Sequence, residues 1–86
     1  MIKYNAYYID GNDNYKLVGS VADSTEAAAL LKEILKEKGF KSYYTRMWIV
    51  ESNEYGYLLK YDFGSWTEFF VVQFDSKEAA HAFVTK

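Results

Sequence analysis

The first 21 residues contain two segments in which apolar and polar side chains alternate, separated by a turn. Residues 10–14 read DGNDN, a run of residue types that favour tight turns. The alternating apolar positions are Ile2, Tyr4, Ala6 and Tyr8 before the turn, and Tyr15, Leu17, Gly19 and Val21 after it. Alternation with a period of two is typical of half-buried strands. The pattern therefore predicts a hairpin of strands at residues 2–10 and 15–21.

Two segments have the pattern of helices. Asp23 can accept hydrogen bonds from free backbone N–H groups, and Glu26 stands three residues later, as in a capping box. The apolar stripe that follows is Ala27, Leu30, Leu31, Ile34 and Leu35. Gly39 suits the left-handed position that ends a helix. A second start at Asp75, with Glu78 three residues on, predicts a short helix with a stripe of Ala79, Ala80, Phe83 and Val84.

The two helix starts repeat one pattern, DSTEAA at residues 23–28 and DSKEAA at residues 75–80. Either both helices need the same cap, or a strand-strand-helix unit has been duplicated. Two strands are expected before the first helix and three before the second. This difference favours a shared capping chemistry over duplication.

Three further strand signals cover residues 42–51, 55–63 and 66–74, with SNE and GS as the breaks between them. The element order is then ββαβββα, within one α+β domain of residues 1–86. We expect a five-stranded, largely antiparallel sheet with the main helix packed on one face. The passage through that helix can place one strand pair in parallel, with a right-handed crossover.

The segment YGYLLKYDFGSWTEFF, residues 55–70, concentrates aromatic side chains in one hairpin. A two-residue turn at Gly64 and Ser65 would place Leu59 opposite Phe70. One face would then carry Tyr55, Tyr57, Leu59, Tyr61, Phe63, Trp66, Glu68, Phe70, Val72 and Phe74. This face is the more apolar of the two, and we expect it to receive the main helix.

The opposite face of that hairpin still carries apolar residues. Leu58, Phe69 and Val71 lie there, beside Lys60 and Asp62. Burial of each apolar side chain would contribute about 1.5–3 kcal/mol, so we expect a cover from the second helix, a second subunit or a target protein. The strand with Tyr43 and Trp48 has the same two-sided character. Its register depends on whether the SNE turn uses two or three residues.

Composition narrows the functional classes. The chain of 86 residues has no cysteine, which excludes disulfides and thiolate zinc sites, and its net charge of −2 provides no general attraction for a nucleic-acid backbone. The N-terminus lacks the pattern of a signal peptide, and no window reaches the 18 or so apolar residues of a membrane span. We expect a soluble cytoplasmic protein that does not act at membranes.

The sequence contains no recognisable catalytic or metal-binding motif. His81 is the only histidine and has no cysteine to activate, so we expect it to face solvent or a helix end. Asp10, Asn12 and Asn14 resemble the start of a calcium loop, but Tyr15 and Val21 replace its glycine and glutamate. Phosphate-binding and nucleophile-elbow motifs are missing. We therefore expect no enzyme activity and no cofactor.

The aromatic residues leave two binding hypotheses open. The stretch YGYLLKY is similar to the central strand of RNA-recognition modules, but Leu58 and Leu59 occupy positions where that module has a small residue and an aromatic. Basic residues do not cluster around it. Tyrosine and tryptophan also dominate protein–protein contacts, although most of them here are expected to fill the core. Protein binding is thus the first hypothesis, and single-stranded nucleic-acid binding is the alternative.

The chain is small, lacks cysteine and proline, has the order strand-strand-helix-strand-strand, and contains the aromatic hairpin YLLKYDFGSW. In these features it resembles small accessory proteins of phages and mobile elements such as anti-CRISPR proteins. The resemblance covers most of residues 1–74 and rests on topology and composition. It implies a non-catalytic inhibitor that binds a host defence complex in the host cytoplasm and blocks nucleic-acid access or a conformational change.

The function expected from the sequence is thus that of a protein-binding module acting by steric block through a sheet face. The candidate partner-binding residues are Leu58, Lys60, Asp62, Phe69, Val71, Tyr43 and Trp48. The partner is a protein, and nucleic acid is not expected as the direct ligand. A homodimer that buries the same face is a further hypothesis, as is a small enzyme or small-molecule binder.

Overall fold

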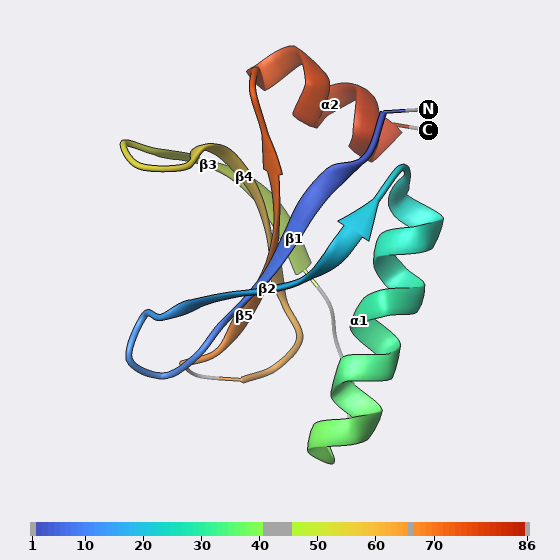
Figure 1. The fold of residues 1–86 in the computed structure, drawn as a ribbon, viewed down its shortest axis with the longest axis vertical. Helices are drawn as coiled ribbons and strands as arrows, with labels where there is room; N and C mark the ends of the chain where they lie inside the picture. The colour runs from blue at the N-terminus through green and yellow to red at the C-terminus, as the bar shows by residue number, and fades with distance from the viewer. Residues whose placement is uncertain (1, 41–45, 66, 86) are drawn as a thin grey trace.

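The computed structural model describes residues 2–40, 46–65 and 67–85. Its elements follow the order ββαβββα, which confirms the predicted α+β fold (Figure 1). The strands are β1 (Tyr4–Ile9), β2 (Tyr15–Val21), β3 (Arg46–Ser52), β4 (Gly56–Asp62) and β5 (Phe69–Phe74). The helices are α1 (Ser24–Lys38) and α2 (Lys77–Thr85). In the described part of the chain, neither helix is long and apolar enough to cross a membrane.

The five strands form one antiparallel sheet in the order β2-β1-β5-β4-β3. β5 lies in the middle and joins the β1–β2 hairpin to the β3–β4 hairpin. The expectation of one parallel pair is wrong for these strands. The reason is that α1 connects β2 and β3, which lie at opposite edges of the sheet and therefore cannot pair.

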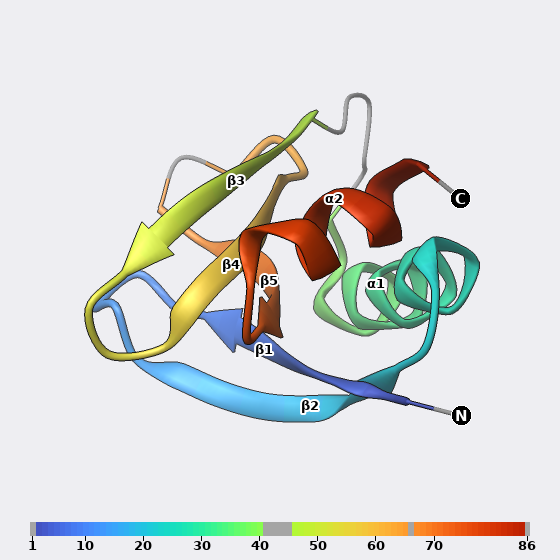
Figure 2. The ribbon, with the colours of Figure 1, turned by 90° about the horizontal axis from the view of Figure 1, so that it is seen from above.

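Both helices cover the same face of the sheet (Figure 2). The main core forms between them and that face, from Ala6, Tyr8, Val21, Ala27, Leu31, Ile34, Leu35, Leu59, Tyr61, Phe63, Phe70, Val72, Phe74, Ala80 and Phe83. Most of the stripe predicted for the first helix is in this list. α2 lies on the same face as α1. It therefore does not cover the opposite face, which was one of the possibilities that the sequence left open.

The ends of α1 follow the predicted capping chemistry. The Asp23 carboxylate accepts from the Glu26 N–H at 2.8 Å, and the Glu26 carboxylate accepts from the Ala22 N–H at 2.8 Å. At the other end Gly39 adopts φ 78°, and the Phe40 N–H donates to the Leu35 carbonyl at 3.0 Å. These local bonds satisfy backbone groups that the helix cannot pair itself.

The start of α2 differs from its counterpart, although the sequence motif is nearly the same. The Ser76 hydroxyl, rather than the predicted Asp75 carboxylate, accepts from the backbone N–H of the residue three positions later, Ala79, at 3.1 Å. The helix therefore begins one residue later in the motif, at Lys77. In both places a short oxygen-bearing side chain caps the helix, but a different residue of the DS pair supplies it.

The strict alternation predicted for residues 15–21 is interrupted by a β-bulge. Ala6 pairs with Gly19 but Tyr7 pairs with Leu17, so Val18 is the extra residue. Beyond the bulge, Val21 belongs to the core under the helices, whereas Tyr15 packs on the other face of the sheet. The expectation that Tyr15 and Val21 share a face is wrong because the inserted residue reverses the alternation.

The β4–β5 pairing differs from the predicted register by two residues. Leu59 pairs with Val72, and Tyr61 pairs with Phe70, because the connection is longer than a two-residue turn. In that connection the Ser65 hydroxyl accepts from the N–H groups of Thr67 and Glu68. The predicted sheet faces are nevertheless correct for the residues that pair between β4 and β5, since a register shift of two positions leaves each side chain on the same face. The prediction for Trp66 lies outside the described residues.

Tyr55 is the exception to the predicted faces. It packs against the cluster of Ile9, Leu58 and Val71 on the face away from the helices. Gly56, with φ 81°, redirects the chain between Tyr55 and β4. Ser52 pairs with Gly56 across this turn, so the β3–β4 connection uses three residues.

Candidate functional site

The candidate site is the open face, which we define as the sheet face opposite the two helices. Its floor is a small nucleus of Ile9, Leu58 and Val71, from β1, β4 and β5. These three side chains are at most 3% exposed. Since no helix of the described chain covers this face, its own side chains must keep water from the nucleus. The residues that pack over or beside it are Tyr7, Tyr15, Val50, Tyr55 and Phe69.

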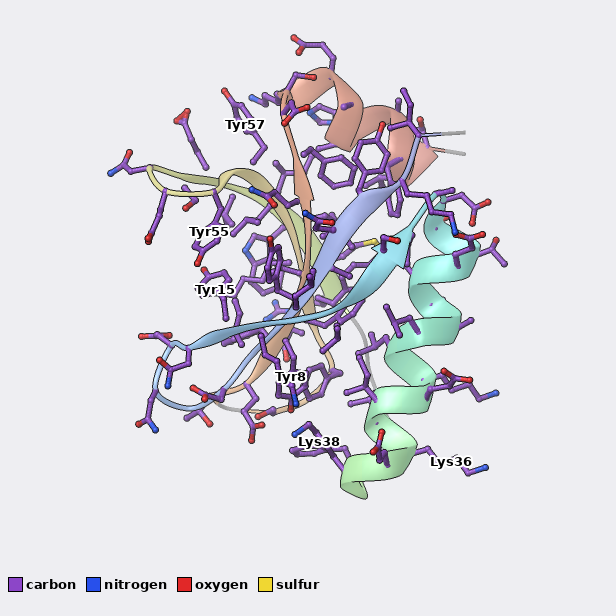
Figure 3. The ribbon with its side chains drawn as sticks, viewed as in Figure 1. Tyr8, Tyr15, Lys36, Lys38, Tyr55 and Tyr57 are labelled. Atoms are coloured by element: carbon purple, nitrogen blue, oxygen red, sulfur yellow. The ribbon has the colours of Figure 1, made fainter. Side chains whose placement is uncertain are left out.

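A tyrosine cluster, formed by Tyr7, Tyr15 and Tyr55, is the main feature of the open face. The rings of Tyr15 and Tyr55 are stacked with centroids 4.4 Å apart and an angle of 13° between their planes. Tyr7 lies 5.7 Å from Tyr55 and 6.2 Å from Tyr15. Figure 3 shows Tyr15 and Tyr55 together on the side of the sheet away from α1. The cluster brings together residues from β1, β2 and the β3–β4 turn.

Gln73 holds this cluster in place. The Tyr7 hydroxyl donates to the Gln73 side-chain oxygen at 3.2 Å, and the Gln73 side-chain nitrogen donates to the Tyr55 carbonyl at 3.0 Å. Burial raises the pKa of Tyr15, assisted by the nearby Tyr55 and by acidic neighbours. Stacking and hydrogen bonds therefore both order the cluster.

Two cations lie over the remaining aromatic rings of the open face. The Lys60 ammonium is 4.1 Å from the centre of the Phe69 ring, and the Arg46 guanidinium is 5.6 Å from the centre of the Trp48 ring. Arg46 also forms an ion pair with Asp62 at 3.4 Å. The face thus combines aromatic area with both signs of charge, and Trp48 is exposed at its edge.

The structure brings most of the predicted binding residues to this one face, but at different depths. Leu58 and Val71 form the buried floor and offer no surface to a partner. Lys60, Asp62 and Phe69 are half-buried, and only these and the exposed Trp48 can touch a partner. Tyr43 lies outside the described residues.

Sequence reasoning missed the tyrosine cluster. Tyr7 and Ile9 are two residues apart in β1 and therefore share one face of the sheet. The period of two could thus have placed Tyr7 on the face opposite to that of Tyr8. Tyr15 and Tyr55 could not be found in this way, because the bulge at Val18 and the left-handed Gly56 change the alternation.

The residues considered for metal binding and catalysis have structural positions instead. The Asp10 carboxylate accepts from the N–H groups of Asn12 and Asn14 at 2.8 and 3.0 Å, and these bonds hold its pKa below the usual range. Asp10 therefore closes the hairpin turn. His81 is exposed on α2. Within residues 2–40, 46–65 and 67–85, no group of three acidic, histidine or cysteine side chains could hold a metal ion.

Comparisons with known proteins add no assignment. No family model matches the chain, and neither the curated proteins nor the solved structures include a match.

Proposed function

We propose that this chain is a non-enzymatic protein-binding module and that the open face is its binding surface. The observation that supports this proposal is the ordered tyrosine cluster on a sheet face that no helix of the described chain covers. Tyrosine provides a large contact area with a polar edge and loses little conformational freedom on binding. A rigid sheet lowers that loss further, because the rings are already positioned.

The arrangement of the rings favours a protein over a nucleic acid. A base that stacks needs a free ring face. One face of Tyr15 is already stacked on Tyr55, and cations lie over Phe69 and Trp48. The groups left to a partner include ring edges, hydroxyls and the charged ends of Lys60 and Asp62, which suit the mixed polar and apolar surface of a protein.

For the partner, we propose a host defence nucleoprotein complex that this chain inhibits by steric block, as in phage-encoded inhibitors acting in the host cytoplasm. The size, element order and aromatic hairpin support this class. The open face carries Lys60 and Arg46 as well as Asp62, so it would recognise a partner by shape and paired charges rather than by mimicry of a polyanion.

The test is affinity capture from a host lysate, followed by mass spectrometry and repetition with single variants. Trp48→Ala and Lys60→Glu change exposed or half-buried positions on the open face without opening the core. Each is expected to reduce the captured partner at least about tenfold, since loss of an aromatic contact or reversal of a charged one can cost roughly 2 kcal/mol or more of binding free energy. Lys16→Glu, an exposed change of the same charge on β2, is the matched control and should retain the partner.

Equal capture by all three variants would exclude the open face as the binding surface. Leu58→Ala is not a suitable probe, because Leu58 is 1% exposed and its truncation would open a cavity in the nucleus. Loss of capture by that variant would not distinguish a damaged fold from a lost contact.

Single-stranded nucleic-acid binding is the second candidate, because the positive charges of Lys60 and Arg46 on the open face would attract a phosphate backbone. It predicts a salt-sensitive rise in fluorescence anisotropy when labelled single strands are titrated at low salt. A flat titration would remove this candidate. A rise that disappears in Lys60→Glu would replace the protein-binding proposal.

A second copy of the chain is another possible cover for the open face. Light scattering over a range of concentrations distinguishes this case. A monomer at all concentrations leaves the face free for a different protein, whereas a dimer that dissociates in Trp48→Ala would identify the open face as a homodimer interface.

A further inference from the structure

The tyrosine cluster lies between the two hairpin turns of the sheet. The β1–β2 turn, residues 10–14, and the β3–β4 turn, residues 53–55, both project on the side away from α1 (Figure 1). Figure 3 shows Tyr15 and Tyr55 between these turns. A side chain that contacts the tyrosines from solvent therefore also comes near both turns.

Both turns are acidic. Their sequences, DGNDN and NEY, contain no lysine or arginine. Asp13 and Glu54 are exposed, one in each turn, and neither carboxylate has a hydrogen bond or an ion pair among the described residues. After burial and the neighbouring Tyr55, the negative charges of these two residues raise the pKa of Tyr15. Two carboxylates from different turns thus lie near one phenol, and a cation placed there would interact with both.

The basic residues close to the cluster, in sequence or on the open face, have other positions. Lys16 follows the first strand turn but borders a cavity on the helix-covered face. The Lys60 ammonium lies over the Phe69 ring, and Arg46 forms an ion pair with Asp62. None of these three cations forms an ion pair with the acidic turns in the described structure, so a matching cation would come from a partner.

The geometry of the rings selects the shape of that cation. Tyr15 and Tyr55 are stacked with their centroids 4.4 Å apart. This spacing leaves no room for an ammonium between the rings, as an aromatic cage for a methylated lysine would require. A guanidinium is planar and can pack flat on an aromatic surface while its N–H groups donate sideways to carboxylates. Both tyrosines are half-buried, so part of the stacked pair is open to solvent.

An exposed apolar side chain extends the surface beside the cluster. Leu17 pairs with Tyr7 between β1 and β2, so the two side chains lie on the same face of the sheet. Leu17 is 58% exposed, whereas Tyr7 is half-buried. The aliphatic stem of an arginine, or an apolar residue next to it, would remove the Leu17 side chain from water.

We propose that the tyrosine cluster is the receptor for an arginine side chain of the protein partner. The guanidinium packs on the exposed surface of the stacked rings and donates to the carboxylates of Asp13 and Glu54, while the adjoining apolar part of the partner covers Leu17. This inference rests on the proposed function, because it names the chemistry that the partner presents to the open face. The same carboxylates would repel a phosphate backbone at this position.

The first test uses blocked pentapeptides of the sequence Gly-Leu-Xaa-Leu-Gly, in which Xaa is arginine, lysine or citrulline. Citrulline keeps the shape of arginine without its charge. The peptides are titrated at millimolar concentrations, with amide shifts recorded by NMR. The arginine peptide should bind about five- to thirtyfold more tightly than the citrulline peptide, from one cation–π contact and two exposed ion pairs. The lysine peptide should fall between them. The shifted amides should lie in both turns and in β2.

The second test removes the two charges at nearly constant shape, by Asp13→Asn combined with Glu54→Gln. Asparagine suits the left-handed backbone of Asp13, where φ is 61°. This double variant should weaken binding of the arginine peptide about three- to tenfold and leave the citrulline peptide unchanged. Glu33→Gln combined with Glu37→Gln, at exposed positions of α1, is the matched control and should retain the full preference for arginine. Nuclear Overhauser effects between the arginine side chain and the rings of the cluster locate the contact.

Three outcomes would overturn this inference. The first is equal affinity, or no binding, for the arginine and citrulline peptides. The second is a preference for arginine that survives the double change of Asp13 and Glu54. The third is amide shifts confined to the helix-covered face. Affinity capture with Trp48→Ala and Lys60→Glu tests the proposed function separately, so loss of capture without any preference for arginine would remove this inference alone.

Discussion

At the scale of single residues, tyrosine has two contrasting roles in this protein. On the open face, the Tyr7 hydroxyl donates to Gln73 and helps to hold the tyrosine cluster. Under α1, the Tyr61 hydroxyl is buried and has no hydrogen-bond partner among the described residues. Alternation in the sequence correctly placed Tyr61 inside. It could not reveal the missing partner, because this depends on which groups α1 and β3 bring within reach.

The first prediction concerns these two hydroxyls. Tyr61→Phe removes an unpaired buried group, so it should raise the free energy of unfolding by up to about 1 kcal/mol, or the melting temperature by roughly 4–8 °C. Tyr7→Phe removes a made hydrogen bond and should lower the free energy of unfolding by about 0.5–1.5 kcal/mol. Thermal and denaturant unfolding of the two variants measure the difference. Equal destabilisation by both would contradict the unpaired state of Tyr61.

At the scale of elements, sequence patterns located all five strands and both helices, because periodicity and capping are local properties. Register was not predictable in the same way. The β4–β5 pairing shifted by two residues because Ser65 organises a longer connection than a two-residue turn. In β2, the bulge at Val18 separated Tyr15 from Val21, and only the neighbouring Gly19 hints at it in the sequence.

The second prediction tests the cap of α2. Ser76→Ala should lower the free energy of unfolding by about 0.5–2 kcal/mol, since the Ser76 hydroxyl accepts from the Ala79 N–H. Asp75→Ala, the adjacent residue of the same motif, should have a clearly smaller effect. Asp23→Ala at α1 is the positive control, because there the aspartate is the cap. Denaturant titrations give all three values. A larger loss for Asp75→Ala than for Ser76→Ala would move the cap back to Asp75.

At the scale of the whole molecule, one sheet separates two different surfaces. Within the described part of the chain, the open face is covered only by its own side chains, chiefly the tyrosine cluster, whereas the helix-covered face has a groove beside Met47. The sequence led us to expect an apolar patch around Leu58, Phe69 and Val71 that the second helix, a second subunit or a target protein would cover. Instead, Leu58 and Val71 are buried beneath tyrosines from distant parts of the chain. The surface that a partner can reach is therefore more polar than the sequence suggested.

The third prediction concerns alkaline pH. Burial raises the pKa of Tyr61 to about 12, and burial also raises the pKa of Tyr8 and Tyr15. The folded state thus favours neutral phenols, and unfolding releases them to ionise near pH 10. This stabilisation is complete below about pH 10 and is lost as pH rises toward the folded pKa values.

Denaturant unfolding at pH 8 to 12 measures this loss, and Tyr61→Phe should retain more of its stability above about pH 10 than the parent chain. Identical pH profiles for the two proteins would show that Tyr61 ionises as easily in the folded state as in the unfolded one. The hydroxyl would then be solvated rather than buried.

The sequence by itself determined the element order, the cap of α1, the apolar stripe of that helix and the inner face of β4 and β5. These features depend on neighbours within a few residues, which a local pattern records. Only the tertiary structure decided that β5 joins the two hairpins, that both helices share one face, and that Tyr7, Tyr15 and Tyr55 meet on the other. Those contacts link residues far apart in the chain, which a local pattern does not record. The bulge in β2 and the left-handed Gly56 each move the neighbouring side chains to the other face of the sheet, and so decide which side chains meet.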